Sequence, residues 1–330
     1  MSGVQKRMLG RTDRKVGVIG LGAWQIGADW GSVPDDAARE VLRTAVASGV
    51  TFIDTADVYG DGRSERLIGE LLASDDGEGV FVATKMGRRV DQRPEHYQAD
   101  NFQAWLDRSR RNLGVDTLDL VQLHCPPSPV YADDAVFAAL DALVAEGVIR
   151  AYGVSVETCA EALAALRRPG VATIQIILNC LRLKPLDEVL PAARDVGVGI
   201  IARVPLASGL LSGRYDESTR FPDDDHRTYN REGGAFDVGE TFAGVPYEVG
   251  LTAVRELARL LPEGMTMAQF ALRWIIDQPG VSTVIPGARD AAQVAANAAA
   301  AQVAALTTDQ RAGVREVYDR LIRPHVHHRW

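Results

Sequence analysis

The chain has 330 residues, 46% of them hydrophobic and 24% charged, and its net charge is -8. This composition is ordinary for a soluble globular protein and leaves little room for extensive disorder. The negative charge disfavours a general nucleic-acid-binding or anionic-membrane surface. The N-terminal segment has no apolar signal core, and no uncharged run is long enough to span a membrane, so we expect a cytoplasmic protein.

Eight short runs rich in valine and isoleucine alternate with longer stretches of helical spacing, which indicates repeated strand–helix units and a parallel sheet. The predicted strands lie at 16–21, 51–55, 80–84, 118–123, 151–155, 173–178, 198–204 and 281–285. Apolar stripes typical of helices lie at 38–46, 67–72, 105–113, 136–144 and 267–275. Eight such units favour a single (β/α)8 TIM barrel of α/β class over residues 1–330, ending in a C-terminal helix.

The spacing breaks down after the seventh predicted strand. Residues 205–247 hold glycines and charged residues without a sustained period, and helical spacing resumes at about residue 248. A loop that long inside a compact domain is usually functional or mobile. We expect it to overhang the C-terminal rim of the barrel and, with Trp24, to wall the substrate pocket, although Trp24 could equally be a core residue.

No metal site is predicted from the cysteines or histidines. The three cysteines are odd in number and widely spaced, which argues against disulfides and a CxxC zinc site. These are Cys125, Cys159 and Cys180. Three histidines lie in the tail, His325, His327 and His328. They have no carboxylate or cysteine ligand beside them, so we expect a flexible tail.

Four polar residues stand where three successive predicted strands end: Asp54, Tyr59, Lys85 and His124. Each alone has an ordinary structural explanation, but the strand ends of one barrel meet at one rim. A tyrosine there can protonate a carbonyl oxygen if its pKa, about 10 unperturbed, is lowered. Lys85 would stabilise the phenolate, Asp54 would keep Lys85 charged and oriented, and His124 would position the carbonyl.

With these residues the sequence resembles the aldo-keto reductase superfamily, whose tetrad is Asp, Tyr, Lys and His in this order. The segments FIDTADVYG, TK and LH agree in register, and LGRT, GLGAW, GVS, QIILN, PLASGLLSGR and VIPGARDAAQVAANAAA extend the likeness over nearly the whole chain. The sequence is more similar to the bacterial and potassium-channel β-subunit branches of this superfamily. The resemblance implies an NADP-dependent oxidoreductase that reduces an aldehyde or ketone to an alcohol, with Tyr59 as general acid.

The resemblance also implies NADPH extended across the C-terminal face of the barrel. The implied cofactor positions are Gly22, Ala23, Trp24 and Asp54 at the nicotinamide ribose, Ser155 and Gln175 at the carboxamide, Val204, Leu206, Ser208 and Arg214 at the pyrophosphate, and Gly287, Arg289, Gln293 and Asn297 at the adenosine end. A cation at position 289 favours NADPH over NADH, because it can form an ion pair with the 2′-phosphate.

The chain also departs from the family pattern. Arg203 stands where the family commonly stacks a tyrosine on the nicotinamide, and its planar guanidinium could stack instead. Gln293 replaces a residue that is basic in many relatives, and Val156 replaces the usual asparagine after the carboxamide-binding serine. Gly87 stands where some relatives place a pocket aromatic.

Two other functions remain open from the sequence. The first is an NADP(H)-binding regulatory subunit with little turnover, as potassium-channel β subunits illustrate. The second is a barrel aldolase that uses Lys85 as a Schiff-base amine, which leaves Tyr59 and Asp54 without a role. The identity of the small-molecule carbonyl substrate and the oligomeric state are not predicted.

Overall fold

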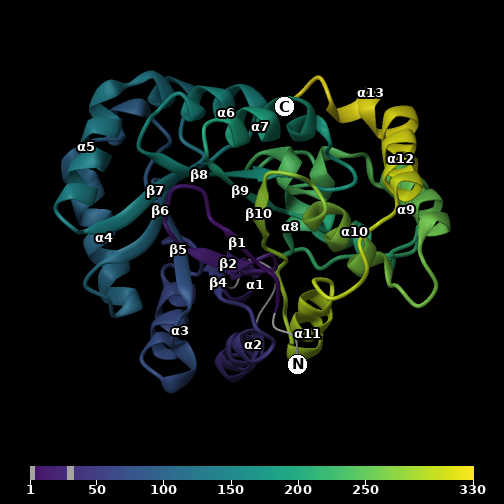
Figure 1. Cartoon of the computed structure of the whole chain (residues 1–330), viewed down its shortest axis with the longest axis horizontal. Coiled ribbons are helices and arrows are strands. Elements are labelled where there is room, and N and C mark those ends of the chain that lie inside the picture. The colour runs from purple at the N-terminus through teal and green to yellow at the C-terminus, as the bar shows by residue number, and fades with distance from the viewer. Residues whose placement is uncertain (1–3, 28–32) are drawn as a thin grey trace.

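The computed structural model describes residues 4–27 and 33–330 and contains a barrel of eight parallel strands surrounded by helices (Figure 1). Its strands are β3 (Leu21–Gly22), β4 (Phe52–Asp54), β5 (Phe81–Met86), β6 (Leu118–His124), β7 (Ile149–Ser155), β8 (Val171–Ile177), β9 (Gly199–Arg203) and β10 (Val281–Val284). They pair in chain order, and bridges from Ile19 to Val284 and from Gly22 to Gly287 join the first strand to the last. The predicted (β/α)8 barrel is confirmed.

The predicted apolar stripes become the inner faces of helices that pack on the barrel. The helices are α1 (Trp24–Gly27), α2 (Asp35–Ala47), α3 (Arg63–Leu72), α4 (Ala99–Leu113), α5 (Asp134–Ala145), α6 (Cys159–Leu166), α7 (Lys184–Asp195), α8 (His226–Tyr229), α9 (Tyr247–Leu257), α10 (Met267–Ile276), α11 (Ala291–Ala299), α12 (Thr308–Val317) and α13 (Arg323–Val326). Their buried positions recur every three or four residues, as in Ala38, Val41, Leu42 and Ala45 of α2. That stripe is what an amphipathic helix needs to cover a sheet.

The predicted first strand is wrong in its extent. Its first residues belong to β2 (Lys15–Gly17), which pairs antiparallel with β1 (Lys6–Met8); the barrel strand is Leu21–Gly22, preceded by the bridge of Ile19 to Val284. The split has a packing reason: Val16 lies with Leu9 in a cluster of barrel-interior residues, so the hairpin forms a separate layer. Figure 1 shows this hairpin inside the ring of helices.

The long loop after the seventh barrel strand is confirmed. Between β9 and α9 the chain forms only short helical turns: η4 (Ala207–Ser212), α8, η5 (Val238–Glu240) and η6 (Phe242–Gly244). Regular helix resumes at Tyr247, one residue before the predicted point. This stretch, residues 205–246, is called the β9 loop below.

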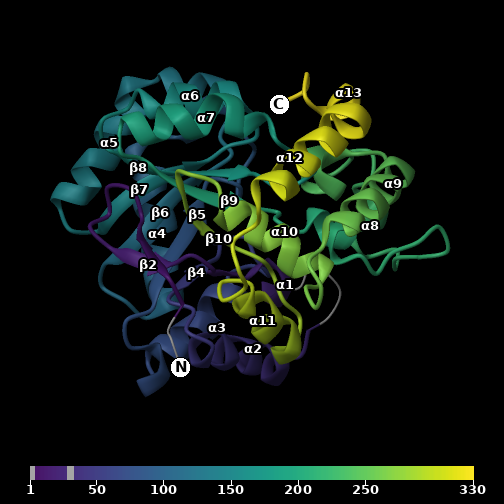
Figure 2. The same cartoon turned by 45° about the vertical axis from the view of Figure 1, so that its right-hand side comes forward.

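The expectation of a flexible tail is wrong. A π-helical turn, η8 (Tyr318–Ile322), links α12 to α13, and both views place these helices beside α9 (Figures 1 and 2). The indole of Trp330 is only 6% exposed and packs against the guanidinium of Arg182. The apolar surface of Trp330 therefore orders the histidine-rich tail. Among the residues that the structure describes, none of the helices has the length and apolar character to cross a membrane.

Candidate active site

Strand register brings the predicted catalytic residues to the carboxyl-terminal rim of the barrel. Asp54 of β4 pairs with Gly22 of β3, Lys85 of β5 pairs with Gln122 of β6, and His124 pairs with Ser155 of β7. Tyr59 follows β4 by five residues, in the turn that leads to α3. The structure therefore brings together the side chains that the sequence predicted to converge.

Lys85 and Asp54 form a buried ion pair at the centre of the rim, with side chains 1% and 4% exposed. The ammonium also donates to the carbonyl oxygen of Thr55 at 2.8 Å. The second carboxylate oxygen of Asp54 accepts from Gln122 at 3.1 Å and from Gln175 at 2.6 Å. Burial alone would lower the pKa of Lys85, but Asp54 and the nearby phenol raise it, so the ammonium stays charged.

Tyr59 lies beside the same ammonium. Lys85 Nζ is 3.4 Å from the phenolic oxygen and 5.1 Å from the ring centroid. Burial raises the pKa of Tyr59, and the charge of Lys85 opposes this shift only in part. The net direction is opposite to the lowered pKa expected from the sequence, because desolvation outweighs the neighbouring cation. The phenol is therefore protonated at neutral pH, which is the state that a proton donor requires.

His124 presents a neutral imidazole to the same space. Its ring lies edge-on to that of Tyr59, with 6.0 Å between the centroids. Burial lowers the pKa of His124, and the cations Arg88, Lys85 and Arg203 lower it further. Its Nδ1 is buried and has no hydrogen-bond partner among the described residues.

Trp24 forms an aromatic wall between the tetrad and the β9 loop. Its ring stacks on Tyr59 at 6.2 Å and contacts His226 at 5.2 Å and Phe236 at 5.7 Å. The last two residues belong to the β9 loop. Trp24 therefore lies between Tyr59 and the β9 loop, and its role as a pocket wall stays a prediction.

The residues predicted at the carboxamide end lie side by side at the ends of β7 and β8. Ser155 pairs with Gln175 in the register of those strands, and both are 1% exposed. Gln175 gives its amide nitrogen to Asp54, which leaves its amide oxygen as the group able to accept from a carboxamide. The thiol of Cys125 donates to the hydroxyl of Ser155 at 3.5 Å.

The predicted pyrophosphate stretch has an unusual backbone. Val204, Ala207 and Ser208 all have positive φ, at 52°, 47° and 53°. A β-branched residue such as Val204 rarely adopts this region, and such strain collects at ligand sites. The hydroxyl of Ser208 is occupied within the β9 loop, since it donates to the carbonyl of Glu240 at 3.0 Å. Leu206 is half-buried, while Arg214 is exposed.

The predicted adenosine positions surround the start of α11. Asn297 donates to the carbonyl oxygen of Gly287 at 3.2 Å. Gln293 is held by Asp290 at 2.7 Å and accepts from the backbone of Arg289 at 3.1 Å. The side chain of Arg289 is exposed. Because Gly22 bridges to Gly287 where the barrel closes, the ribose and adenosine positions lie on neighbouring segments of one rim.

Sequence reasoning missed a group of charged residues beside His124, here called the ion-pair ring: Arg88, Glu157, Arg203 and Glu240. Glu157 lies 3.0 Å from Arg88 and 2.8 Å from Arg203, and Glu240 lies 3.4 Å and 3.6 Å from the same arginines. Arg203 was predicted as a cofactor residue, and the structure places it in these ion pairs. Arg88 and Glu157 stand soon after β5 and β7, and their charges at these strand ends could have indicated the ring from the sequence. Nothing in the sequence of the β9 loop distinguished Glu240 from the other acidic residues there.

The pKa values of the two carboxyl groups in the ring are shifted in opposite directions. Burial would raise the pKa of Glu157, but Arg203 and Arg88 lower it to about 2. Burial raises the pKa of Glu240 in spite of the same arginines, and Glu157 adds to that shift. Cys125, Glu157 and Glu240 offer ligand atoms within 4.8 Å of one another. Because guanidinium groups already hold both carboxylates, this cluster is an ion-pair network and we assign no metal to it.

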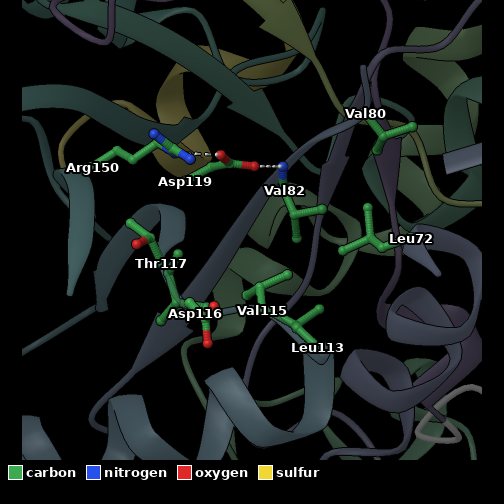
Figure 3. A pocket seen from close by; sticks show the side chains of 10 residues that line it. Leu72, Val80, Val82, Leu113, Val115, Asp116, Thr117, Asp119 and Arg150 are labelled. Atoms are coloured by element: carbon green, nitrogen blue, oxygen red, sulfur yellow. Dashed lines mark hydrogen bonds and ion pairs between the residues drawn. The ribbon is translucent and has the colours of Figure 1, made fainter. Parts of the chain in front are cut away.

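A cavity of about 390 Å³ lies at the other end of the barrel, near the starts of β5 and β6 (Figure 3). Leu72, Leu113 and Val115 line it, and Asp119 is held there by Arg150 at 3.2 Å. Barrel enzymes build their sites at the carboxyl ends of the strands. The tetrad contributes nothing to the lining of this cavity, so we assign it no catalytic role.

Comparison with known proteins identifies the family. The sequence model of the Aldo/keto reductase family matches residues 18–319. An uncharacterized oxidoreductase of Mycobacterium tuberculosis is 34% identical, covering 88% of this chain and 85% of its own. The glycerol dehydrogenase AKR11B4 from Gluconobacter oxydans is 30% identical at a TM-score of 0.79, covering 98% of this chain and 97% of its own. An aldo/keto reductase from Klebsiella pneumoniae, solved with NADP and acetate, is 26% identical at a TM-score of 0.69 and covers 96% of both chains. The chain therefore belongs to the aldo/keto reductase family, and it is an oxidoreductase.

Proposed function

We propose that the protein reduces an aldehyde or ketone to an alcohol with NADPH, and that Tyr59 donates the proton. The observation that carries this proposal is the contact of the Tyr59 hydroxyl with a charged, buried Lys85 that is itself paired with Asp54. A protonated phenol beside a fixed ammonium can release its proton to a carbonyl oxygen, because the phenolate left behind is stabilised by that ammonium.

The chain offers a consistent setting for the cofactor. Val204 and Ser208, which have positive φ, follow the carboxyl end of β9, and the cations Arg214 and Arg289 are exposed. These features suit an extended dinucleotide that carries several phosphates. When bound, NADPH supplies the hydride for the carbonyl carbon.

The residues of the chain perform the other parts of the reaction. His124, neutral because of its burial, can donate a hydrogen bond to the carbonyl oxygen and orient it toward Tyr59. Asp54 holds the ammonium of Lys85 in place, and Gln122 and Gln175 hold Asp54. Solvent then restores the proton on Tyr59. The same groups run the oxidation of an alcohol in reverse.

The preference for NADPH over NADH rests on Arg289, whose exposed guanidinium can pair with a 2′-phosphate. The Klebsiella pneumoniae relative was solved with NADP, which agrees with this proposal. The aldolase alternative loses support, because a Schiff base requires a neutral amine. The pKa of Lys85 is shifted upward and the ammonium is bound to a carboxylate.

The test is consumption of NADPH against a panel of aldehydes, ketones and sugar-like carbonyls, with Tyr59→Phe as the matched control. This change removes only the phenolic hydroxyl. We expect kcat to fall by about 100-fold or more, the size of a general-acid contribution, while NADPH still binds. Full activity in the variant refutes the mechanism. Tight NADPH binding by the wild type without turnover of any carbonyl indicates a regulatory subunit instead.

A further inference from the structure

The ion-pair ring holds the backbone next to two site residues. Arg88 donates from Nε to the carbonyl oxygen of His124 at 3.2 Å. Arg203 donates to the carbonyl oxygen of Val156, the neighbour of Ser155, at 3.1 Å. The ring therefore contacts the backbone at the ends of both β6 and β7, on the active-site rim.

Glu240 is the ring member that comes from the β9 loop; Arg203 is the last residue of β9, and Arg88 and Glu157 follow closely after β5 and β7. Its main chain is tied within that loop, because the hydroxyl of Ser208 donates to the Glu240 carbonyl oxygen and accepts from the amide of Phe242 at 3.1 Å. The place of Glu240 between the two arginines therefore depends on what fixes this part of the loop.

Two residues outside the loop, Trp330 and Arg182, and one within it, Asp237, fix that part of the loop; the three are here called the loop anchor. The indole Nε1 of Trp330 donates to Asp237 at 3.1 Å, and Asp237 accepts from the amide of Gly239 at 2.6 Å, which caps the turn that carries Glu240. The guanidinium carbon of Arg182 lies 3.5 Å from the centre of the indole. This is a close cation–π contact.

Arg182 and Trp330 of the loop anchor pack tightly against the glycines of the loop. A Cβ atom at Gly239 would lie 2.1 Å from an Arg182 nitrogen, and one at Gly244 would lie 2.3 Å from the Trp330 ring. Arg182 is 2% exposed, and its guanidinium nitrogens have no hydrogen-bond partner among the described residues. Burial lowers the pKa of Arg182 to about 9. The guanidinium lies against the indole, so the arginine and the tail hold each other in place.

We propose that Trp330 is a positioning residue for the active site: through Asp237 it seats Glu240 between Arg88 and Arg203 and so completes the ion-pair ring. The effect passes from Trp330 to Asp237, then to η5 and Glu240, and from there to the arginines that hold the backbone of His124 and Val156. This inference rests on the proposed function only in using NADPH as its probe.

The test uses Trp330→Phe, Glu240→Gln and the double variant. Phenylalanine keeps an aromatic face on Arg182 and removes the N–H that binds Asp237, so it disturbs packing less than alanine. Glutamine keeps the shape of Glu240 and removes its charge. His328→Ala and Asp224→Asn are the controls, because both residues are exposed and lie in the same tail and the same loop.

Two quantities are measured: the dissociation constant of NADPH, and the rate of tryptic cleavage of the cofactor-free protein at the exposed Arg220 and Arg231 of the loop. We expect each single variant to weaken NADPH binding by about fivefold or more, as for coupled sites, and to speed cleavage. Because both changes act on one connection, the double variant should bind about as weakly as Glu240→Gln alone.

An unchanged dissociation constant in Trp330→Phe overturns the proposal. So does a double variant in which the two effects multiply, because independent effects indicate that Trp330 only adds stability. If the wild type fails to bind NADPH, the proposed function fails. The cleavage rates then still decide the inference: faster cleavage confined to Trp330→Phe and Glu240→Gln supports it, and cleavage equal to the controls overturns it.

Discussion

Replacing Asp54 with alanine should destabilise the protein strongly, because it leaves a buried ammonium without its carboxylate. Lys85 is 1% exposed, and after the change the Thr55 carbonyl remains as its acceptor together with the phenolic oxygen at 3.4 Å. Breaking a buried ion pair in this way costs about 3–5 kcal/mol. The amides of Gln122 and Gln175 lose an acceptor as well, which adds about 1 kcal/mol.

The sum, roughly 4–6 kcal/mol, can be converted to a melting temperature. An unfolding entropy of about 2.1 cal/mol/K per residue gives roughly 0.7 kcal/mol/K for a chain of this length, so Tm should fall by about 6–9 °C. Urea unfolding followed by circular dichroism gives the free energy, and calorimetry gives Tm.

The double variant Asp54→Ala with Lys85→Met supplies the control. It removes both charges, so it should regain about 2 kcal/mol or more relative to Asp54→Ala alone. A loss under about 1 kcal/mol in the single variant, or a double variant less stable than the single one, refutes the reasoning that the cost arises from an uncompensated charge.

Two further predictions concern pH and the cofactor. Burial lowers the pKa of His226 to about 4, so the unfolded chain takes up a proton below about pH 6.5 that the folded protein excludes. Stability should therefore fall between pH 6.5 and 4 by up to about 1.4 kcal/mol per pH unit from this residue. His226→Gln should remove that slope, which urea unfolding of the wild type and the variant at pH 7, 6 and 5 measures. If the free energy of unfolding changes with pH equally in both proteins, His226 is not the cause of the slope. Arg289→Gln should weaken NADPH binding by about tenfold or more and leave NADH unchanged; equal weakening of both cofactors argues against contact with the 2′-phosphate.

The barrel and the tetrad were predictable because their signals are local. Asp54, Lys85 and His124 each stand at or beside the end of an apolar run, and the helical stripes between those runs imply parallel strands whose ends meet. The tetrad could therefore be predicted from the fold class and the residue types alone. The direction of the Tyr59 pKa was not predictable in the same way, because it depends on how far the closed rim excludes water.

The ion-pair ring and the loop anchor could not be predicted from the sequence because they join distant segments. Glu240 meets Arg88 across 152 positions, and Trp330 meets Asp237 across 93. The β9 loop has no period that would fix the direction of Glu240. The sequence around Trp330 is rich in histidine and arginine, which is typical of a solvated tail. The burial of Trp330 follows from its contact with Arg182, which the sequence does not reveal.

The β1–β2 hairpin gives the molecule a natural face for attachment. Leu9 and Val16 pack among the interior side chains of the barrel, and Arg7 binds the carbonyl oxygen of Val281 at 2.9 Å. This end is therefore sealed, while its turn leaves Arg11 and Asp13 exposed. Linking the protein to a surface through that turn would point every molecule the same way, with the catalytic rim and the β9 loop toward the solution.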